Sequence, residues 1–215
     1  MSFHLFDHSR DFPSDHALLS PSKGFWVDYD SEKMFNYICS SYASTIGTLI
    51  HELAAKLITN KIKVTRNEAR KMITLYLLEN KIPRFIIDAE RYVNNFVAYV
   101  NDAIGFDMKA EVKVMYSPNA FGTIDAFRFN EKKMHLRIHD YKSGVLKPNM
   151  RQLELYASLF CMEYKIKPGD LEMELRLYWQ EEMLVENPTA ADIAPLIDKI
   201  VQFDKYINSL KGEEG

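Results

Sequence analysis

The stretch "GTIDAFRFNEKKMHLRIHDYKSG", residues 122–144, predicts two strands joined by a tight turn. Apolar and polar residues alternate on both sides of "EKKM", residues 131–134, as they do in half-buried strands. A hairpin folded symmetrically about this turn sets Asp125 opposite Asp140, and opposed side chains in a sheet have Cβ atoms about 5 Å apart. Residues two apart share one face of a strand, so Lys142 lies beside Asp140.

Two buried carboxylates this close repel each other, and one of them must bind a proton unless a cation lies between them. A divalent ion satisfies both, because hard oxygen ligands converge on it. Asp125 could instead cap a turn, with Asp140 and Lys142 forming an ordinary ion pair. Strand interiors are poor in Asp, and two acids with a lysine need partners in one place. The pattern therefore favours a metal site in which Lys142 orients a water molecule or stabilises charge on a phosphate.

The rest of the chain predicts a mixed α/β protein in a single domain, 1–215. Residues 1–30 are rich in turn formers and predict irregular structure or short helical turns. A helical part follows at 31–104, then a sheet with one helix at 108–181, and a last helix at 189–210. The expected helices are 30–60, 65–79 (opened by a Thr65–Glu68 capping box), 84–103, 148–164 and 189–210, and the expected strands are 110–117, 121–129, 134–142 and 171–179.

Composition excludes several classes of protein. The 215 residues are 47% apolar with a formal net charge of -3, enough for one substantial core. Cys39 and Cys161 are too few for a disulfide framework or a zinc ribbon. The sequence has neither a secretory signal pattern nor an apolar run of about 20 residues, so we expect a cytoplasmic protein without a membrane partner.

Charge is distributed unevenly along the chain. Residues 61–151 hold 17 Lys and Arg against 10 Asp and Glu, a net of +7, which leaves -10 for the remainder. Such a basic middle is compatible with a polyanionic partner, and equally with solvated surface charge.

Three residues on predicted helices could join the site. His51 lies at the edge of an apolar stripe, and its small neighbours, among them Gly47, let that helix approach the sheet closely. An imidazole at a helix edge is otherwise an ordinary packed or solvated residue. Gln152 and Tyr156 are four apart and share one helix face, from which they could hydrogen-bond around Lys142 or a phosphate.

These motifs together resemble the PD-(D/E)XK nuclease superfamily, and in particular its RecB-like branch of CRISPR-associated and phage-encoded exonucleases. That branch carries a helical His, "G-x-x-D" on a strand, "D-Y-K-[ST]-G", and "Q-x-x-x-Y" on the next helix. The matching pieces of this chain are His51, "GTID" ending at Asp125, "DYKSG" with Asp140 and Lys142, and "QLELY". They span about half of the chain in the same order and spacing. "LSPSKGFW", residues 19–26, is also similar to the openings of phage members.

The resemblance implies a restriction-endonuclease-like core, α-βββ-α-β, with a mixed central sheet flanked by helices and with extra N-terminal helices. It implies hydrolysis of DNA phosphodiester bonds, with Mg²⁺ or Mn²⁺ held by His51, Asp125, Asp140 and the main-chain carbonyl of Tyr141. An imidazole ligand favours Mn²⁺. Lys142 would position the attacking water. Supporting roles fall to Gln152 and Tyr156, and Glu111 matches a glutamate often present on the preceding strand.

The chain departs from those relatives that bind an iron–sulfur cluster through four cysteines, so we expect no such cluster. We expect the basic middle to contact DNA, through Lys132, Lys133, Lys147 and Arg151 and through Lys61, Lys63, Arg66, Arg70 and Lys71. Three activities remain open: an exonuclease on DNA ends in phage or bacterial recombination or replication, a structure- or sequence-selective endonuclease, and a DNA-binding module without catalysis. A recombination or replication partner and a homo-oligomer are also compatible with the sequence.

Overall fold

The structure is a computed structural model that describes residues 18–144 and 147–212. It divides into two compact units, Met1–Thr45 and Ile46–Gly215. The irregular segment expected at 1–30 lies outside the described residues up to position 17. No helix within the described part of the chain is both long and apolar enough to cross a membrane.

The described part of the N-terminal unit is helical. It contains the 3-10 helix η1 (Pro21–Asp28) and the helix α1 (Ser31–Ser41), neither of which has a buried residue. Three aromatic rings pack against one another between them, with centroids 5.7 to 6.0 Å apart: Phe25, Tyr29 and Tyr37. Local ring contacts thus hold these two elements together.

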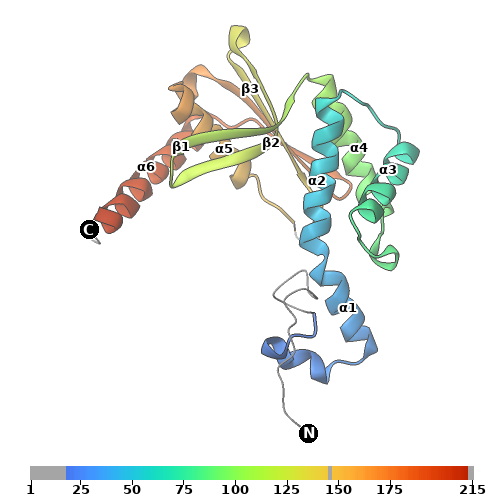
Figure 1. Cartoon of the computed structure of the whole chain (residues 1–215). Coiled ribbons are helices and arrows are strands. Elements are labelled where there is room, and N and C mark those ends of the chain that lie inside the picture. Colours follow the sequence, from blue (N-terminus) through green and yellow to red (C-terminus); the bar gives the residue numbers. More distant parts are fainter. Residues whose placement is uncertain (1–17, 145–146, 213–215) are drawn as a thin grey trace. The chain divides into compact units, whose positions relative to one another are not determined.

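The larger unit contains a mixed five-stranded sheet flanked by helices (Figure 1). The strands follow the order β1-β2-β3-β4-β5; β3 and β4 are parallel, and the other neighbours are antiparallel. Their bounds are β1 Lys109–Ser117, β2 Ala120–Asn130, β3 His135–Lys142, β4 Glu172–Trp179 and β5 Glu182–Glu186.

Helices cover both faces of this sheet. Along β3, Leu136 and Ile138 join the core formed with α5 and α6, whereas the ring of Tyr141 stacks on Tyr99 of α4. Alternate strand residues face opposite ways, so α4 and α5 lie on opposite faces. The helices are α2 Ala43–Thr59, α3 Arg66–Glu79, α4 Glu90–Gly105, α5 Arg151–Tyr164 and α6 Ala190–Gly212, with short 3-10 turns at η2 Arg84–Ile86, η3 Glu131–Lys133 and η4 Pro168–Asp170.

Most of the predicted elements are confirmed, and the capping box that opens α3 is present in full, with Thr65 and Glu68 satisfying each other's backbone N–H groups. Three predictions of bounds were wrong. The segment 30–60 is two helices, 84–103 is a 3-10 turn followed by a helix from Glu90, and the helix expected from Pro148 begins at Arg151. The strand β5 was not predicted.

Candidate active site

The β2–β3 hairpin brings Asp125 and Asp140 to neighbouring strands. Its antiparallel register pairs Ala126 with His139, so the two aspartates occupy the next position along both strands, as the sequence predicts. The side chain of Asp140 is 2% exposed and that of Asp125 is 16% exposed. Asp125 Oδ2 accepts a hydrogen bond of 3.1 Å from the backbone N–H of Tyr141. The carboxylates therefore meet where the hairpin ladder ends.

Asp140 carries an unfavourable charge in this position. Burial raises its pKa to about 6, and the negative charge of Asp125 pushes in the same direction. The ammonium of Lys142 opposes both effects from 2.9 Å. Even so, Asp140 Oδ2 is buried and has no hydrogen-bond partner of good geometry among the described residues. Lys142 Nζ lies 2.9 Å from this oxygen, whose remaining lone pairs could bind a metal ion.

His51 reaches the carboxylates from α2. Its Nδ1 lies 3.1 Å from Asp125 Oδ2. Burial lowers the pKa of His51, but the hydrogen bond to Asp125 and the charges of the two aspartates outweigh it, so the net pKa is raised. The close approach depends on Gly47, one helical turn earlier, because a Cβ there would lie 3.2 Å from Ser143 Oγ. Gly47 thus allows α2 to approach the end of β3, as its small size predicts.

A chain of hydrogen bonds fixes Lys142 on the α5 side. Its Nζ donates to Gln152 Oε1 at 2.7 Å, and Gln152 Nε2 donates to the hydroxyl of Tyr156 at 3.1 Å. The ring of Tyr156 fills the space beside Gly122, where a Cβ would lie 2.7 Å from a ring carbon. Gly122 therefore makes room for the ring of Tyr156.

Glu111 approaches the same place from β1 through an unusual backbone. It lies between the pairs Ala110–Ala126 and Val112–Ile124, which sets it opposite Asp125, and its φ is 54°. A positive φ in a strand marks a local irregularity that redirects the side chain. Burial and the charge of Asp125 raise the pKa of Glu111.

The residues present fit a divalent cation in donor chemistry. Asp125 and Asp140 offer carboxylate oxygens and His51 an imidazole nitrogen. The N–H and C=O of one strand residue point to the same side, so the Tyr141 carbonyl faces Asp125 as its N–H does. Within the described residues, no group of three or more His, Cys, Asp or Glu side chains is close enough to hold an ion as it stands. A bound ion would need small movements of these side chains toward it.

The predicted DNA-contacting residues are scattered. Lys132 and Lys133 lie at the tip of the β2–β3 hairpin, seven or more residues from Asp140, which is roughly 20 Å along a strand. Arg151 begins α5 next to Gln152 and pairs with Glu154 at 3.2 Å. The hairpin-tip lysines and Arg151 could therefore contact only different parts of a long DNA molecule.

Three of the other predicted basic residues already form ion pairs with acidic side chains. Arg66 and Arg70 both pair with Glu90, and Lys61 pairs with Asp107 at 2.9 Å. These exposed pairs contribute little to stability, but they weaken the case for an uninterrupted basic groove on α3.

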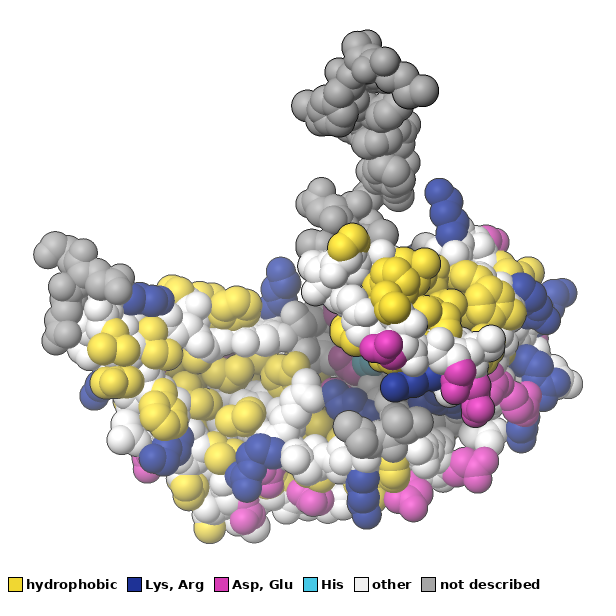
Figure 2. All heavy atoms as spheres, turned by 90° about the horizontal axis from the view of Figure 1, so that it is seen from below, with side chains coloured by type: hydrophobic (Ala, Val, Ile, Leu, Met, Phe, Trp, Pro, Cys, Tyr) yellow, Lys and Arg dark blue, Asp and Glu magenta, His cyan; other side chains and the backbone are white. Residues whose placement is uncertain are grey.

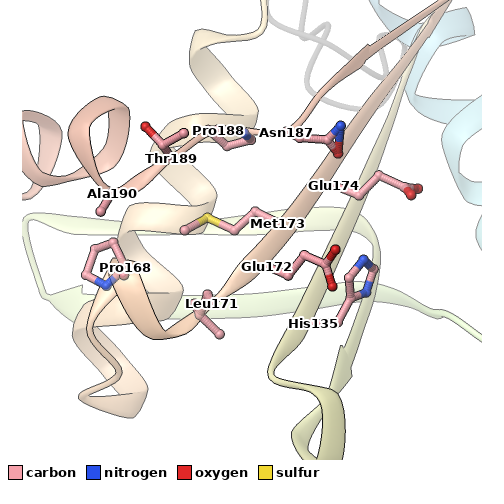
Figure 3. Close-up of a pocket in the computed structure, with 11 residues that line it drawn as sticks. His135, Pro168, Leu171, Glu172, Met173, Glu174, Asn187, Pro188, Thr189 and Ala190 are labelled. Atoms are coloured by element: carbon pink, nitrogen blue, oxygen red, sulfur yellow. The ribbon is translucent and has the colours of Figure 1, made fainter.

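A separate cavity of about 630 Å³ lies away from the carboxylates (Figure 3). It is formed by the start of β4, by His135 at the start of β3, and by the segment that leads into α6, with Asn187 and Thr189 on its far side. Glu174 in its wall is bound by Arg137 and Arg176, both at 2.7 Å. The cavity takes in none of the residues predicted for catalysis.

Sequence reasoning missed Arg91 of α4, which lines a small hollow together with Lys142 and Ser143 of the "DYKSG" motif. Arg91 is 51 positions away in the chain, and no periodicity links it to the "DYKSG" motif. Only the folded sheet brings α4 to this point.

Comparisons with known proteins add no family. A scan against protein-family models found no match, and a search of the curated proteins found none either.

Proposed function

We propose that this chain is a metal-dependent deoxyribonuclease of the PD-(D/E)XK type that hydrolyses phosphodiester bonds at DNA ends. The observation that carries the proposal is the meeting of Asp125 and Asp140 on adjacent strands, with His51 bonded to the first and Lys142 to the second. Two carboxylates and an imidazole can hold a divalent ion, and an amine beside them can orient a water or stabilise charge on a phosphate.

The order of elements supports the same proposal. A helix, three antiparallel strands, a helix and a parallel fourth strand follow one another as α4, β1, β2, β3, α5 and β4. The same order of elements is expected of a restriction-endonuclease-like α-βββ-α-β core, which supports the proposal. The preference for ends rests on the resemblance to phage and CRISPR-associated exonucleases.

Each residue has a role in the proposed reaction. A divalent ion held by Asp125, Asp140, His51 and the Tyr141 carbonyl would supply Lewis-acid assistance. Lys142 would orient the attacking water and stabilise charge on the phosphate, because its ammonium is aimed by Asp140 and Gln152.

Gln152 keeps the Lys142 ammonium in place. The hydroxyl of Tyr156 accepts a hydrogen bond from the amide of Gln152. The ring of Tyr156 packs against Gly122 and so joins α5 to β2. These hydrogen bonds hold the ammonium of Lys142 near Asp140 before the substrate arrives.

The test uses labelled linear single- and double-stranded DNA and a closed circular plasmid, each with Mg²⁺ or Mn²⁺. We expect linear DNA to be degraded and the circle to be spared. Lys142→Ala should lower the rate by about 100-fold or more. Lys167→Ala changes an exposed lysine before β4, at the end of the sheet away from Asp140, and should cut at nearly the wild-type rate.

Other outcomes would overturn this proposal in distinguishable ways. Cleavage of the closed circle would make the protein an endonuclease on the same site. Tight DNA binding with no cleavage in either metal would make it a binding module. A cleavage rate unchanged by Lys142→Ala would show that the cleavage does not depend on the proposed site.

A further inference from the structure

A small hollow adjoins the residues proposed to act on DNA. It is formed by the end of β3 with the turn that follows it, by the first part of α4, and by the turn from β4 to β5. Tyr141 and Lys142, which belong to the proposed metal site, are part of its wall. The other lining residues are Arg91, Tyr92, Asn95, Ser143, Gly144 and Gln180. Most of the wall thus consists of groups that the proposed reaction does not use.

Arg91 brings a positive charge to this hollow. It lies in the first turn of α4, and its side chain is exposed. None of the ion pairs among the described residues includes Arg91. The preceding residue, Glu90, is bound by Arg66 and Arg70 instead. A guanidinium without a carboxylate partner can bind a phosphate through two of its N–H groups.

The size of the hollow limits what it can bind. Its volume is about 20 Å³. One water molecule needs about 10 to 15 Å³, so the hollow has room for one atom of oxygen size. A base or a sugar ring is too large, whereas a single phosphate oxygen fits. Phosphates are common to all nucleotides, so a contact of this kind carries no sequence information.

The hollow is also close enough to the carboxylates to meet the same DNA strand. Ser143 follows Asp140 by three residues, which is at most about 10 Å along an extended chain. One strand of duplex DNA carries a phosphate about every 3.4 Å along the helix axis. A strand cut at Asp140 therefore has a phosphate near the hollow about three nucleotides or fewer from the cut. In Figure 2, basic and acidic side chains are interspersed over the described part of the face shown, so DNA would meet separate cations there.

We propose that Arg91 binds a second phosphate of the DNA strand that is cut, with one oxygen of this phosphate in the hollow. The inference rests on the proposed nuclease function, because it assigns a neighbouring phosphate of the same substrate. Arg91 contacts the DNA backbone and not the reacting atoms, and it holds the strand across Asp125 and Asp140. Its loss should therefore raise KM more than it lowers kcat.

The first experiment measures DNA binding in EDTA, where no metal-dependent cleavage occurs, by fluorescence anisotropy over a range of salt concentrations. Arg91→Ala should weaken binding about five- to tenfold and reduce the salt slope by about one phosphate contact. Arg91→Lys should keep the slope but recover only part of the affinity, because an ammonium cannot bind bidentately. Lys167→Ala removes an equal charge at the other end of β4 and should bind like the wild type. Unchanged binding by Arg91→Ala, or equal weakening by Lys167→Ala, would overturn the proposal.

A second experiment identifies the phosphate. A labelled oligonucleotide carries one uncharged methylphosphonate at a time, at each of the three phosphates on either side of the first bond that is cut in Mn²⁺. At one position the change should lower kcat/KM of the wild type by about the same factor as Arg91→Ala does. Arg91→Ala should lose nothing further at that position, because the contact is already absent. Equal losses in both proteins at every position would refute the contact.

The inference and the proposed function can fail separately. A wild type that binds DNA without cutting it would refute the nuclease, while the comparison in EDTA would still decide whether Arg91 binds a phosphate. Cleavage that depends on Lys142 but not on Arg91 would leave the nuclease in place and remove the second phosphate site.

Discussion

Replacing Gly47 by alanine should lower the rate of DNA cleavage without lowering the stability of the protein. Gly47 lies in the interior of α2, where alanine is favoured over glycine by about 1 kcal/mol. The new Cβ, however, would lie 3.2 Å from Ser143 Oγ, a few tenths of an ångström closer than an ordinary contact. The domain should therefore stay as stable as the wild type while α2 shifts away from the end of β3.

The shift acts on His51, which is one turn along the same helix and 3.1 Å from Asp125. A displacement of about 1 Å in a catalytic constellation costs on the order of 100-fold in rate, so a few tenths should cost about three- to tenfold. We expect Gly47→Ala to lower the rate of DNA cleavage by this factor and to raise the Mn²⁺ concentration needed for half-maximal rate.

Two matched variants make this test specific. Gly105→Ala, at the end of α4, meets nothing within 4 Å and should leave the rate unchanged. The double variant Gly47→Ala with Ser143→Ala removes the contacted oxygen and should recover most of the lost rate. Wild-type cleavage by Gly47→Ala alone, or no recovery in the double variant, would refute the reasoning.

Three further predictions concern the same structure. Gly122→Ala should displace the ring of Tyr156, lowering thermal stability by about 1 to 3 kcal/mol together with the cleavage rate; an unchanged melting temperature would contradict this. The hydrogen bond from Arg137 lowers the pKa of Glu174 from 4.5 to about 2, so its carboxylate stabilises the fold above about pH 4.5 and ceases to do so as the pH falls toward 2. Glu174→Gln should therefore unfold in urea about 2 kcal/mol more easily than wild type at pH 7 and equally easily near pH 2; a constant difference across this range would contradict it. His51→Ala should reduce the cleavage rate with Mn²⁺ more than the rate with Mg²⁺. An equal reduction in both metals would show that the imidazole of His51 does not bind the metal ion.

Much of the sheet could be predicted because alternation is a strong local signal. The strands β2 and β3 alternate around a turn, so the same pattern that predicts them also predicts the register that sets Asp125 opposite Asp140. The strand β5 was missed because it is five residues long and its turn has no glycine or asparagine: Gln180 adopts a φ of 51° there. Such turns are normally signalled by Asn-Gly or Asp-Gly.

The helix starts and the assembled site were harder to predict. Proline is common in the first turn of a helix, so the helix was expected to begin at Pro148. Instead, Asn149 Oδ1 accepts a hydrogen bond from the backbone N–H of Arg151, and α5 begins at Arg151. The contact between His51 and Asp125 joins residues 74 positions apart, which no periodicity encodes. Their association was suggested by the small residues beside His51 and by the resemblance to known nucleases, and the contact of α2 with the sheet agrees with it.

The most direct test of the central claim is anomalous diffraction from crystals of this protein grown in Mn²⁺. We expect a manganese peak between the carboxylates of Asp125 and Asp140, within bonding distance of both and of His51. The claim would be contradicted by well-ordered aspartates with no peak between them, or by manganese bound only at another part of the chain.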